Sequence, residues 1–343
     1  MVFGVGLLVN AFLVAIPVGG SVGALMGIDA HRAATGQKPL FTGGNSENGI
    51  TPGTGGGHGG DTSTGDGGGH DSTSGENNSM RNTQYCDLSW GITPPSKSEQ
   101  YTLNPNQWGV TSITTGNGLC MNVTTFNNKT YLAQTAPEFS VTWQFDPGPE
   151  TAPVHGYPNI RVDDVLPLEM DQISELNLDL HWTYGVGNQP AASTEVQALK
   201  DENLAANVAI DMFLDSDADK AKNGTDAKFE VMVWFWMSSL VAQPYGWGKP
   251  VINRTLEGID FTLYTGVNGQ KQHVLSWVTE DMTEKFTGDI YPLITDLFNM
   301  EGADYPAKDD FLGSLSFGTE AYSVDRNVTF WAEQYMIDIK TRA

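Results

Sequence analysis

The sequence predicts an all-β fold, a sandwich of two packed sheets, for the globular part of the chain at about residues 82–343. Many short runs of β-branched and aromatic residues alternate with clusters of turn residues, a pattern typical of strands joined by short connections. The clearest strand runs are "ANVAIDMFLD", "FEVMVWFWM", "GIDFTLYTG", "KQHVLSWVTE" and "NVTFWAEQYMIDI". The turns include "GVNGQ", "QPYGWGKP" and "DADKAKNGTD".

One segment of the globular part has helical periodicity. It covers residues 288–300, "GDIYPLITDLFNM". Ile290, Leu293, Ile294 and Leu297 recur at the spacing that places side chains on one face of a helix. The prediction is therefore a β-sandwich with one helix.

The chain begins with a hydrophobic leader, expected at residues 1–30. Residues 2–28 carry no charge, and the segment is long enough to span a bilayer, which takes about 20 apolar residues. We expect a signal anchor or a signal peptide. Against an anchor stand Arg32 and Lys38, which follow the segment, because the positive-inside rule would leave that side in the cytoplasm.

A flexible linker is expected at residues 31–81. Gly, Ser, Thr, Asp and His dominate its residues 43–80, and such a composition buries too little apolar surface to offset the entropy of ordering. His58 and His70 lie near aspartates, but nothing rigid would hold them as metal ligands. The linker is equally compatible with a glycosylated stalk.

Cysteines and sequons indicate an exported protein. The two cysteines are Cys86 and Cys120, and in an exported domain such a pair is more often a disulfide than a catalytic or metal site. We expect an extracellular or cell-surface protein, either secreted or anchored to the membrane by the leader. Asn-X-Ser/Thr sequons, which mark the eukaryotic secretory route, occur at Asn77, Asn122, Asn128, Asn223, Asn253 and Asn327.

The net charge of the chain argues against some classes of binding partner. A formal net charge of −23 argues against nucleic acid or an anionic membrane surface, because like charges repel. It does not oppose a neutral polysaccharide. No cofactor or metal is expected, since His155, His181 and His273 are scattered without the spacing of zinc ligands.

The acidic segment "DSDADKAKNGTD", residues 215–226, has a spacing of aspartates that resembles a calcium-binding loop. However, Lys220 stands where such a loop needs glycine, and Asp226 stands where it needs glutamate. We therefore interpret the segment as an acidic hairpin loop.

A buried carboxylate is predicted in "AKFEVMVWFWMSS", residues 227–239. Strand alternation puts Glu230 on one face with Met232, Trp234 and Trp236. Burial among such side chains raises the pKa of a carboxyl unless a partner compensates. A salt bridge or an exposed edge strand would explain Glu230 without any chemistry, so this residue alone leaves both interpretations open.

Two further carboxylates favour a chemical role. Asp211 lies in the middle of "ANVAIDMF", and a hairpin between this run and that of Glu230 would bring the two side chains to one surface. Glu320 lies in "SFGTEAY", another β run. Cleavage of a glycosidic bond needs two opposed carboxylates, one at the anomeric carbon and one that protonates the leaving oxygen, and tryptophan faces stack on sugar rings.

Seven short segments together resemble glycoside hydrolase family 12. "FEVMVW" resembles the strand that bears the nucleophile of the family, "FGTEAY" resembles its acid/base segment, and "ANVAIDMF" is similar to its strand with a helper aspartate. "CDLSW", "NQWG" followed by Cys120, "YPNI" and "LYTGVNG" fall in the family's order. The resemblance covers about residues 85–340.

The resemblance implies a jelly-roll β-sandwich with a concave substrate cleft. It also implies a retaining endo-β-1,4-glucanase that works through a covalent glycosyl-enzyme intermediate. By motif position Glu230 would be the nucleophile, Glu320 the acid/base, and Asp211 a carboxylate that tunes Glu230. Cys86 and Cys120 match the N-terminal disulfide of the family.

The resemblance also places side chains in the sugar-binding cleft. These are Asn106, Trp108, Met232, Trp90 and Trp143. For Trp90 and Trp143 a position in the hydrophobic core is at least as compatible with the sequence.

The chain departs from the family pattern after Glu320, where Ala321 and Tyr322 stand in place of the common proline, and in loops that are longer or more aromatic than usual. The expected partner is plant cell-wall β-glucan or xyloglucan, bound by a monomer. One alternative is an enzyme specific for xyloglucan, for which the loops at 143–157 and 240–250 would set the cleft width. Another is a non-catalytic carbohydrate-binding or elicitor-like sandwich. A mildly acidic pH optimum is expected.

Overall fold

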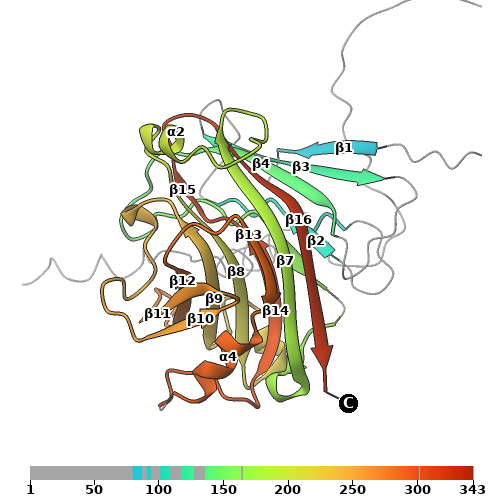
Figure 1. Cartoon of the computed structure of the whole chain (residues 1–343), viewed down its shortest axis with the longest axis vertical. Helices are drawn as coiled ribbons and strands as arrows, with labels where there is room; N and C mark the ends of the chain where they lie inside the picture. The colour runs from blue at the N-terminus through green and yellow to red at the C-terminus, as the bar shows by residue number, and fades with distance from the viewer. Residues whose placement is uncertain are drawn as a thin grey trace, which may run out of the picture.

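Two β-sheets pack face to face around the hydrophobic core (Figure 1). The computed structural model describes residues 80–86, 91–93, 101–108, 117–126, 136–163, 165–300 and 302–342. Within these ranges sheet A contains, in spatial order, β1 (Met80–Tyr85), β3 (Gly118–Phe126), β4 (Glu138–Gln144), β16 (Val328–Thr341), β7 (Ile173–Val186) and β13 (Lys285–Asp289).

Sheet B carries the residues of chemical interest. Its main path is β10 (Ile252–Leu256), β11 (Ile259–Val267), β12 (His273–Thr279), β9 (Phe229–Met237), β8 (Ala205–Asp215), β14 (Phe311–Gly318), β5 (Asn159–Val162) and β2 (Tyr101–Asn104). β15 (Ala321–Ser323) pairs with β8, and β6 (Leu168–Glu169) pairs with β14. The prediction of an all-β sandwich is confirmed.

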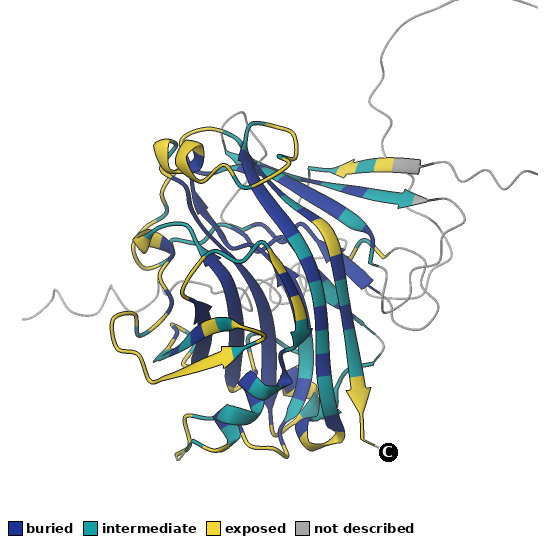
Figure 2. Cartoon of the chain, in the orientation of Figure 1, coloured by how far each residue is buried: buried dark blue, intermediate teal, exposed yellow. Residues whose placement is uncertain are grey.

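The alternation of β8 and β9 explains how the central strands of sheet B are buried on both faces (Figure 2). On β8, Val208, Ile210 and Met212 belong to the core between the sheets. Ala209, which points the other way, packs instead with Met232 on the face turned away from sheet A. The residues of β8 and β9 on that second face are buried as well, so both sides of these two strands lose contact with water.

The predicted hairpin of β8 and β9 is present. The two strands pair antiparallel, with Asp211 opposite Met232 and Phe213 opposite Glu230. Asp211 and Glu230 are therefore diagonal neighbours on one face of sheet B.

The predicted position of Trp236 beside Glu230 is wrong. Val208 pairs with Trp236 and Ala209 pairs with Trp234, so Phe235 is an extra residue in a β-bulge. The bulge interrupts the alternation of β9 and brings Trp236 into the core, where its ring stacks on Trp182 with 5.7 Å between ring centroids.

The predicted helix at residues 288–300 is present but shorter. Helix α4 (Tyr291–Phe298) packs at the end of the sandwich with Leu293, Ile294 and Leu297 buried (Figure 1). Residues 285–289 belong to β13 instead.

The expectation of a single helix is wrong for the described residues, which also form α2 (Val196–Asp201), α3 (Ala218–Ala221) and the 3₁₀ turns η1 (Met170–Gln172) and η2 (Leu240–Ala242). These segments are too short for a helical period to be visible in the sequence.

Aspartates of the acidic loop at residues 215–226 accept hydrogen bonds from the backbone of the loop and its surroundings. The side chain of Asp217 caps α3 by accepting hydrogen bonds from the backbone N–H groups of Asp219 and Lys220. Asp215 accepts from the backbone N–H groups of Asp217 and Lys228. In the part of the chain that the structure describes, no group of three or more His, Cys, Asp or Glu side chains could hold a metal ion.

The leader, Trp90 and the linker as far as residue 79 lie outside the described residues, whereas residues 80 and 81 of the expected linker begin strand β1. In the described part, no helix has the length and apolar character that a membrane crossing requires.

A disulfide joins Cys86, which follows β1, to Cys120 in β3. The cysteines are 34 residues apart, and closing such a loop in the unfolded chain is worth about 3–4 kcal/mol. We expect the Cys86→Ser/Cys120→Ser double variant to lose roughly this much free energy of unfolding in urea titrations. A parent whose stability does not change on reduction would contradict this expectation.

Candidate active site

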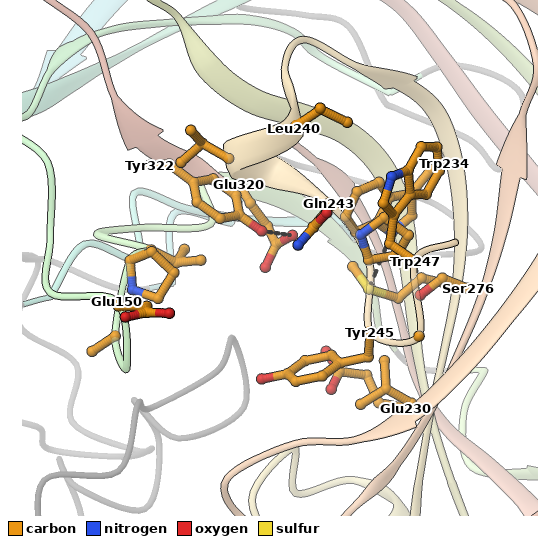
Figure 3. A pocket seen from close by; sticks show the side chains of 18 of the residues that line it. Glu150, Glu230, Trp234, Leu240, Gln243, Tyr245, Trp247, Ser276, Glu320 and Tyr322 are labelled. Atoms are coloured by element: carbon orange, nitrogen blue, oxygen red, sulfur yellow. Dashed lines mark hydrogen bonds between the residues drawn. The ribbon is translucent and has the colours of Figure 1, made fainter. Parts of the chain in front are cut away.

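A cleft with a volume of about 770 Å³ lies on the face of sheet B that is turned away from sheet A. Its floor comes from β9 and β12, including Glu230, Trp234 and Ser276 (Figure 3). Met232 of β9 also lines it. One wall is the segment 240–249 and the opposite wall is the segment 148–154. The two loops that the sequence analysis expected beside the cleft therefore line it.

The 240–249 wall is held close to strand β11. Gly246 has a φ of +79°, and a Cβ atom there would lie 2.2 Å from the carbonyl oxygen of Thr265. Glycine is the residue that permits both the conformation and the close approach. The contact sets the aromatic side chains of Tyr245 and Trp247, on either side of Gly246, along the cleft.

Glu230 is buried at the cleft floor, with 3% of its surface exposed. Its Oε2 accepts a hydrogen bond of 3.1 Å from Nδ2 of Asn268. Asn268 is itself oriented by Gln272, whose backbone N–H and side-chain carbonyl it contacts at 3.0 and 2.8 Å. Burial, followed by the negative charge of Glu320, raises the pKa of Glu230 to about 8, against the lowering effect of Asn268.

Glu320 follows β14 and is held by Asn207 of β8. Nδ2 of Asn207 donates to Oε2 of Glu320, and Oδ1 of Asn207 accepts from the backbone N–H of Glu320 at 2.9 Å. The hydroxyl of Tyr322 donates to the same Oε2 at 3.3 Å. Burial raises the pKa of Glu320 to about 7, although the two donors stabilise its charged form.

Asp211 lies beneath the pair and is fully buried. None of the described side chains donates a hydrogen bond to its carboxylate oxygens. Burial, and then the charges of Glu230 and Glu320, raise its pKa well above the usual range. Folding therefore favours the neutral, protonated form of Asp211.

We expect Asp211→Asn to change how the stability of the protein depends on pH. A carboxyl whose pKa is raised by folding contributes stability below its unfolded pKa of about 4, and this contribution is lost as pH rises toward the folded pKa. Asparagine does not titrate, so the stability of the variant relative to the parent should increase with pH, by up to about 1.4 kcal/mol per pH unit. Urea unfolding at pH 4, 6 and 8 measures this slope, and equal slopes would refute the assignment.

The structure brings together four of the predicted site residues: Glu230, Glu320, Asp211 and Met232. Met232 lies on the cleft floor and its sulfur accepts a hydrogen bond of 3.2 Å from the indole N–H of Trp234. These residues come from β8, β9 and the end of β14, which are adjacent in sheet B.

Asn106 and Trp108 do not line the cleft formed by the described residues. The carbonyl of Asn106 accepts from the backbone N–H of Tyr157 at 2.9 Å, and the N–H of Trp108 donates to the carbonyl of His155 at 2.8 Å. The backbone at Gly156 pairs in turn with Ala321, next to Glu320. Asn106 and Trp108 thus support the segment that holds Glu320 in place.

The predicted cleft position of Trp143 is wrong. Trp143 belongs to β4 of sheet A and lies in the core between the sheets with 1% of its surface exposed. Its indole N–H donates to the hydroxyl of Tyr184. A side chain on the inner face of sheet A cannot reach a cleft on the far face of sheet B.

Three residues around the two glutamates had no clear functional signal in the sequence. Asn207 shares the polar face of its strand with Asp211, which was its only signal. Asn268 lies in the turn "GVNGQ", where an asparagine needs no explanation beyond turn geometry. The pKa of Tyr245 is raised to about 12 by burial and by the charges of Glu230 and Glu320, so its hydroxyl lies within the field of both carboxyls.

Comparison with known proteins is consistent with this site. The model of the family described as "Glycosyl hydrolase family 12" matches residues 99–340. A probable xyloglucan-specific endo-beta-1,4-glucanase A of Neosartorya fischeri is 27% identical over 257 residues, which are 75% of this chain and 92% of the relative. The xyloglucan-specific endo-beta-1,4-glucanase A of Aspergillus aculeatus is 25% identical over 261 residues, or 76% and 93% of the two chains.

Solved structures show the same fold. Endoglucanase 3 of Trichoderma harzianum, from family GH12, superposes with a TM-score of 0.58 at 22% identity, over 76% of this chain and 98% of the other. A family 12 xyloglucanase of Bacillus licheniformis gives a TM-score of 0.53 at 15% identity, over 76% and 100% of the two chains.

Proposed function

Because the chain belongs to glycosyl hydrolase family 12, we propose that it is a retaining endo-β-1,4-glucanase that hydrolyses internal bonds of a cell-wall glucan. One observation carries the proposal: two buried glutamates from separate segments, Glu230 and Glu320, share one cleft, and the charge of Glu320 contributes to the raised pKa of Glu230. A pure binding module needs neither glutamate. Xyloglucan is the favoured polymer, because the curated fungal relatives carry that specificity in their names.

In the proposed mechanism the carboxylate of Glu230 attacks the anomeric carbon and forms a glycosyl ester. The bond from that carbon to the leaving oxygen breaks as the carboxylic acid of Glu320 donates its proton to this oxygen. Glu320, now a carboxylate, then removes a proton from water, whose oxygen displaces Glu230 and regenerates both groups. Two displacements at one carbon retain its configuration.

The surrounding side chains would hold this geometry. Asn268 orients the nucleophile, and Asn207 with Tyr322 orients the acid/base. Asp211 lies diagonal to Glu230 and its raised pKa favours the neutral form, so it would oppose the charge of the nucleophile less than an ionised carboxylate would. Trp247, with 37% of its surface exposed, would offer a ring face to a sugar unit, whereas Trp234 lines the cleft but is almost fully buried.

The roles of the two glutamates rest on motif position. Their pKa values, about 8 for Glu230 and about 7 for Glu320, do not by themselves put the shared proton on Glu320. Glutamine at each position in turn separates the two roles.

We expect a bell-shaped pH profile whose alkaline limb lies near pH 7–8. The active pair holds one proton: it reaches this state as pH rises through the lower of its two raised pKa values, about 7, and loses the remaining proton as pH rises through the higher, about 8. With ordinary pKa values the loss would come near pH 4–5. This places the optimum nearer to neutrality than the sequence suggested. The test is kcat/KM measured from pH 3 to 10, and an alkaline limb below pH 6 would count against it.

The proposed activity can be tested with the full chain secreted from a eukaryotic host. Carboxymethyl-cellulose, barley β-glucan and xyloglucan would be incubated with the protein, and new reducing ends counted. Release of reducing ends supports the proposal, and the preferred polymer defines the specificity. Protein that is retained on one polymer in a pull-down but cuts none would point to the binding-module alternative.

We further propose an extracellular location, with residues 1–30 as anchor or signal, residues 31–81 as linker and residues 82–343 as the catalytic domain. The disulfide between Cys86 and Cys120 supports an oxidising compartment. Antibody against the catalytic domain, applied to intact cells and to the medium, distinguishes anchored from released protein. Detection in neither would refute the location.

A further inference from the structure

A second cavity of about 530 Å³ lies beside the cleft. We call it the side chamber, and the residues that matter for its chemistry are Trp247, Asn253, Thr262, Tyr264, Glu280 and Asp281. They come from β10, β11, the segment after β12 and the 240–249 wall of the cleft. Its volume falls within the range of small-molecule sites, about 300–1,000 Å³.

The side chamber and the cleft share the outer face of sheet B. Ser276 on the cleft floor is directly opposite Tyr264 of the neighbouring strand, and Val278 is opposite Thr262. Trp247 lines both cavities, so it forms the partition between them. The chamber therefore begins one strand away from the cleft floor.

The chamber has an aromatic wall and a polar rim. Trp247 and Tyr264 lie with their ring centroids 4.9 Å apart, and 37% of the surface of Trp247 is exposed. At the rim stand the exposed carboxylates of Glu280 and Asp281, which form no ion pair with a described side chain. Aromatic faces pack against the C–H groups of a pyranose, and carboxylates accept hydrogen bonds from its hydroxyls.

The charge of the rim selects among sugars. Two unpaired carboxylates repel an acidic sugar and favour a neutral one. The partition by Trp247 also bears on the occupant, because a linear chain lying in the cleft does not enter a cavity on the other side of that ring. A sugar branch that leaves the backbone sideways can enter that cavity.

We propose that the side chamber binds a neutral monosaccharide branch of the polymer whose backbone lies in the cleft. The preferred substrate is then a β-1,4-glucan with single-sugar branches. The inference rests on the proposed function, since it needs a glucan backbone in the cleft, and it adds the residues that would recognise the branch.

The protein offers one competing occupant. Asn253, Arg254 and Thr255 form a sequon, and the side chain of Asn253 is exposed at the chamber with its Oδ1 accepting a hydrogen bond of 3.1 Å from Thr262. A glycan attached to Asn253 would lie at the chamber entrance. The experiment therefore includes Asn253→Gln, together with mass spectrometry of the peptide around residue 253.

The test compares branched and unbranched substrates with the full chain. Thr262→Phe fills the chamber, whereas Thr262→Val removes only the hydroxyl. Asp281→Asn removes one rim charge, and Asp309→Asn makes the same change at an exposed aspartate outside both cavities. We expect Thr262→Phe to lower kcat/KM on xyloglucan at least tenfold, and Asp281→Asn to lower it severalfold. Activity on unbranched barley β-glucan should stay within twofold, and Asp309→Asn should change neither.

Equal changes on both polymers, or none on xyloglucan, would overturn the inference. Calorimetric binding to Glu230→Gln keeps the result separate from the proposed function, because it needs no cleavage. In that background a xyloglucan heptasaccharide should bind at least tenfold more tightly than cellotetraose, and Thr262→Phe should abolish the difference. If the parent cuts no polymer but Glu230→Gln binds the heptasaccharide more tightly than cellotetraose, the proposed function is refuted and the assignment of the side chamber is supported. If neither Glu230→Gln nor its Asn253→Gln derivative prefers the branched ligand, the chamber assignment fails.

Discussion

Replacing Glu230 by glutamine is expected to lower kcat on the preferred polymer by about 10⁴-fold or more. An amide cannot form the glycosyl ester, and removal of one member of a catalytic pair typically costs this much. KM should change little, because glutamine is close to glutamate in shape and the sugar contact of Trp247 stays in place. Reducing-end assays under substrate saturation give both constants.

The matched control for this variant is Glu150→Gln. Glu150 also lines the cleft, on the opposite wall, but is exposed (Figure 3). Its replacement should change kcat less than tenfold. Added azide gives a further test: a single displacement in Glu230→Gln would yield the α-glycosyl azide from a β-linked substrate. A Glu230→Gln variant with more than 1% of parental kcat would refute the assignment of the nucleophile.

Replacing Glu320 by glutamine is expected to have an effect that depends on the leaving group. On polymer, where the leaving sugar oxygen needs a proton, kcat/KM should fall by about 10²–10⁴-fold, the usual contribution of a general acid. On an aryl cellobioside with an acidic phenol as leaving group, the first step needs no proton and should stay within about tenfold of the parent. A burst of phenol followed by slow turnover would show that the glycosyl ester accumulates.

Azide distinguishes this variant from Glu230→Gln. In Glu320→Gln the nucleophile is intact, so azide attacks the glycosyl ester in a second displacement and yields the β-glycosyl azide. If the two substrates lose the same fraction of activity, Glu320 is not the acid. If the α and β products are exchanged between the two variants, the roles of the glutamates are reversed, which their pKa values alone leave open.

Local patterns in the sequence, together with the family resemblance, predicted three carboxylates that the structure brings close to one another. Strand alternation placed Glu230 and Asp211 on single faces, and the turn-rich segment between their runs predicted the hairpin that makes them diagonal neighbours. The sandwich, the helix near residue 291 and the loops beside the cleft were equally visible, because each depends on residues close together in the chain.

The partners of these carboxylates depend on contacts between distant segments. Asn207 holds Glu320 across 113 residues and Asn268 holds Glu230 across 38 residues, and neither asparagine differs in the sequence from an ordinary polar residue. The wrong prediction for Trp143 has the same origin. Alternation shows that Trp143 faces one side of a strand, but not that its strand belongs to the other sheet.

By itself the sequence determined the class of fold, the strands that carry the acidic groups and the family of the chain. Alternation and short motifs depend on residues that are neighbours in the sequence. Only the tertiary structure decided which aromatic rings face the cleft, because a bulge in β9 redirects Trp236 and the packing of the two sheets encloses Trp143. It also decided that Trp247 divides one face of sheet B into a cleft and a side chamber. This division arises where the loop at residues 240–249 contacts strand β11, and no periodic pattern in the sequence indicates such a contact.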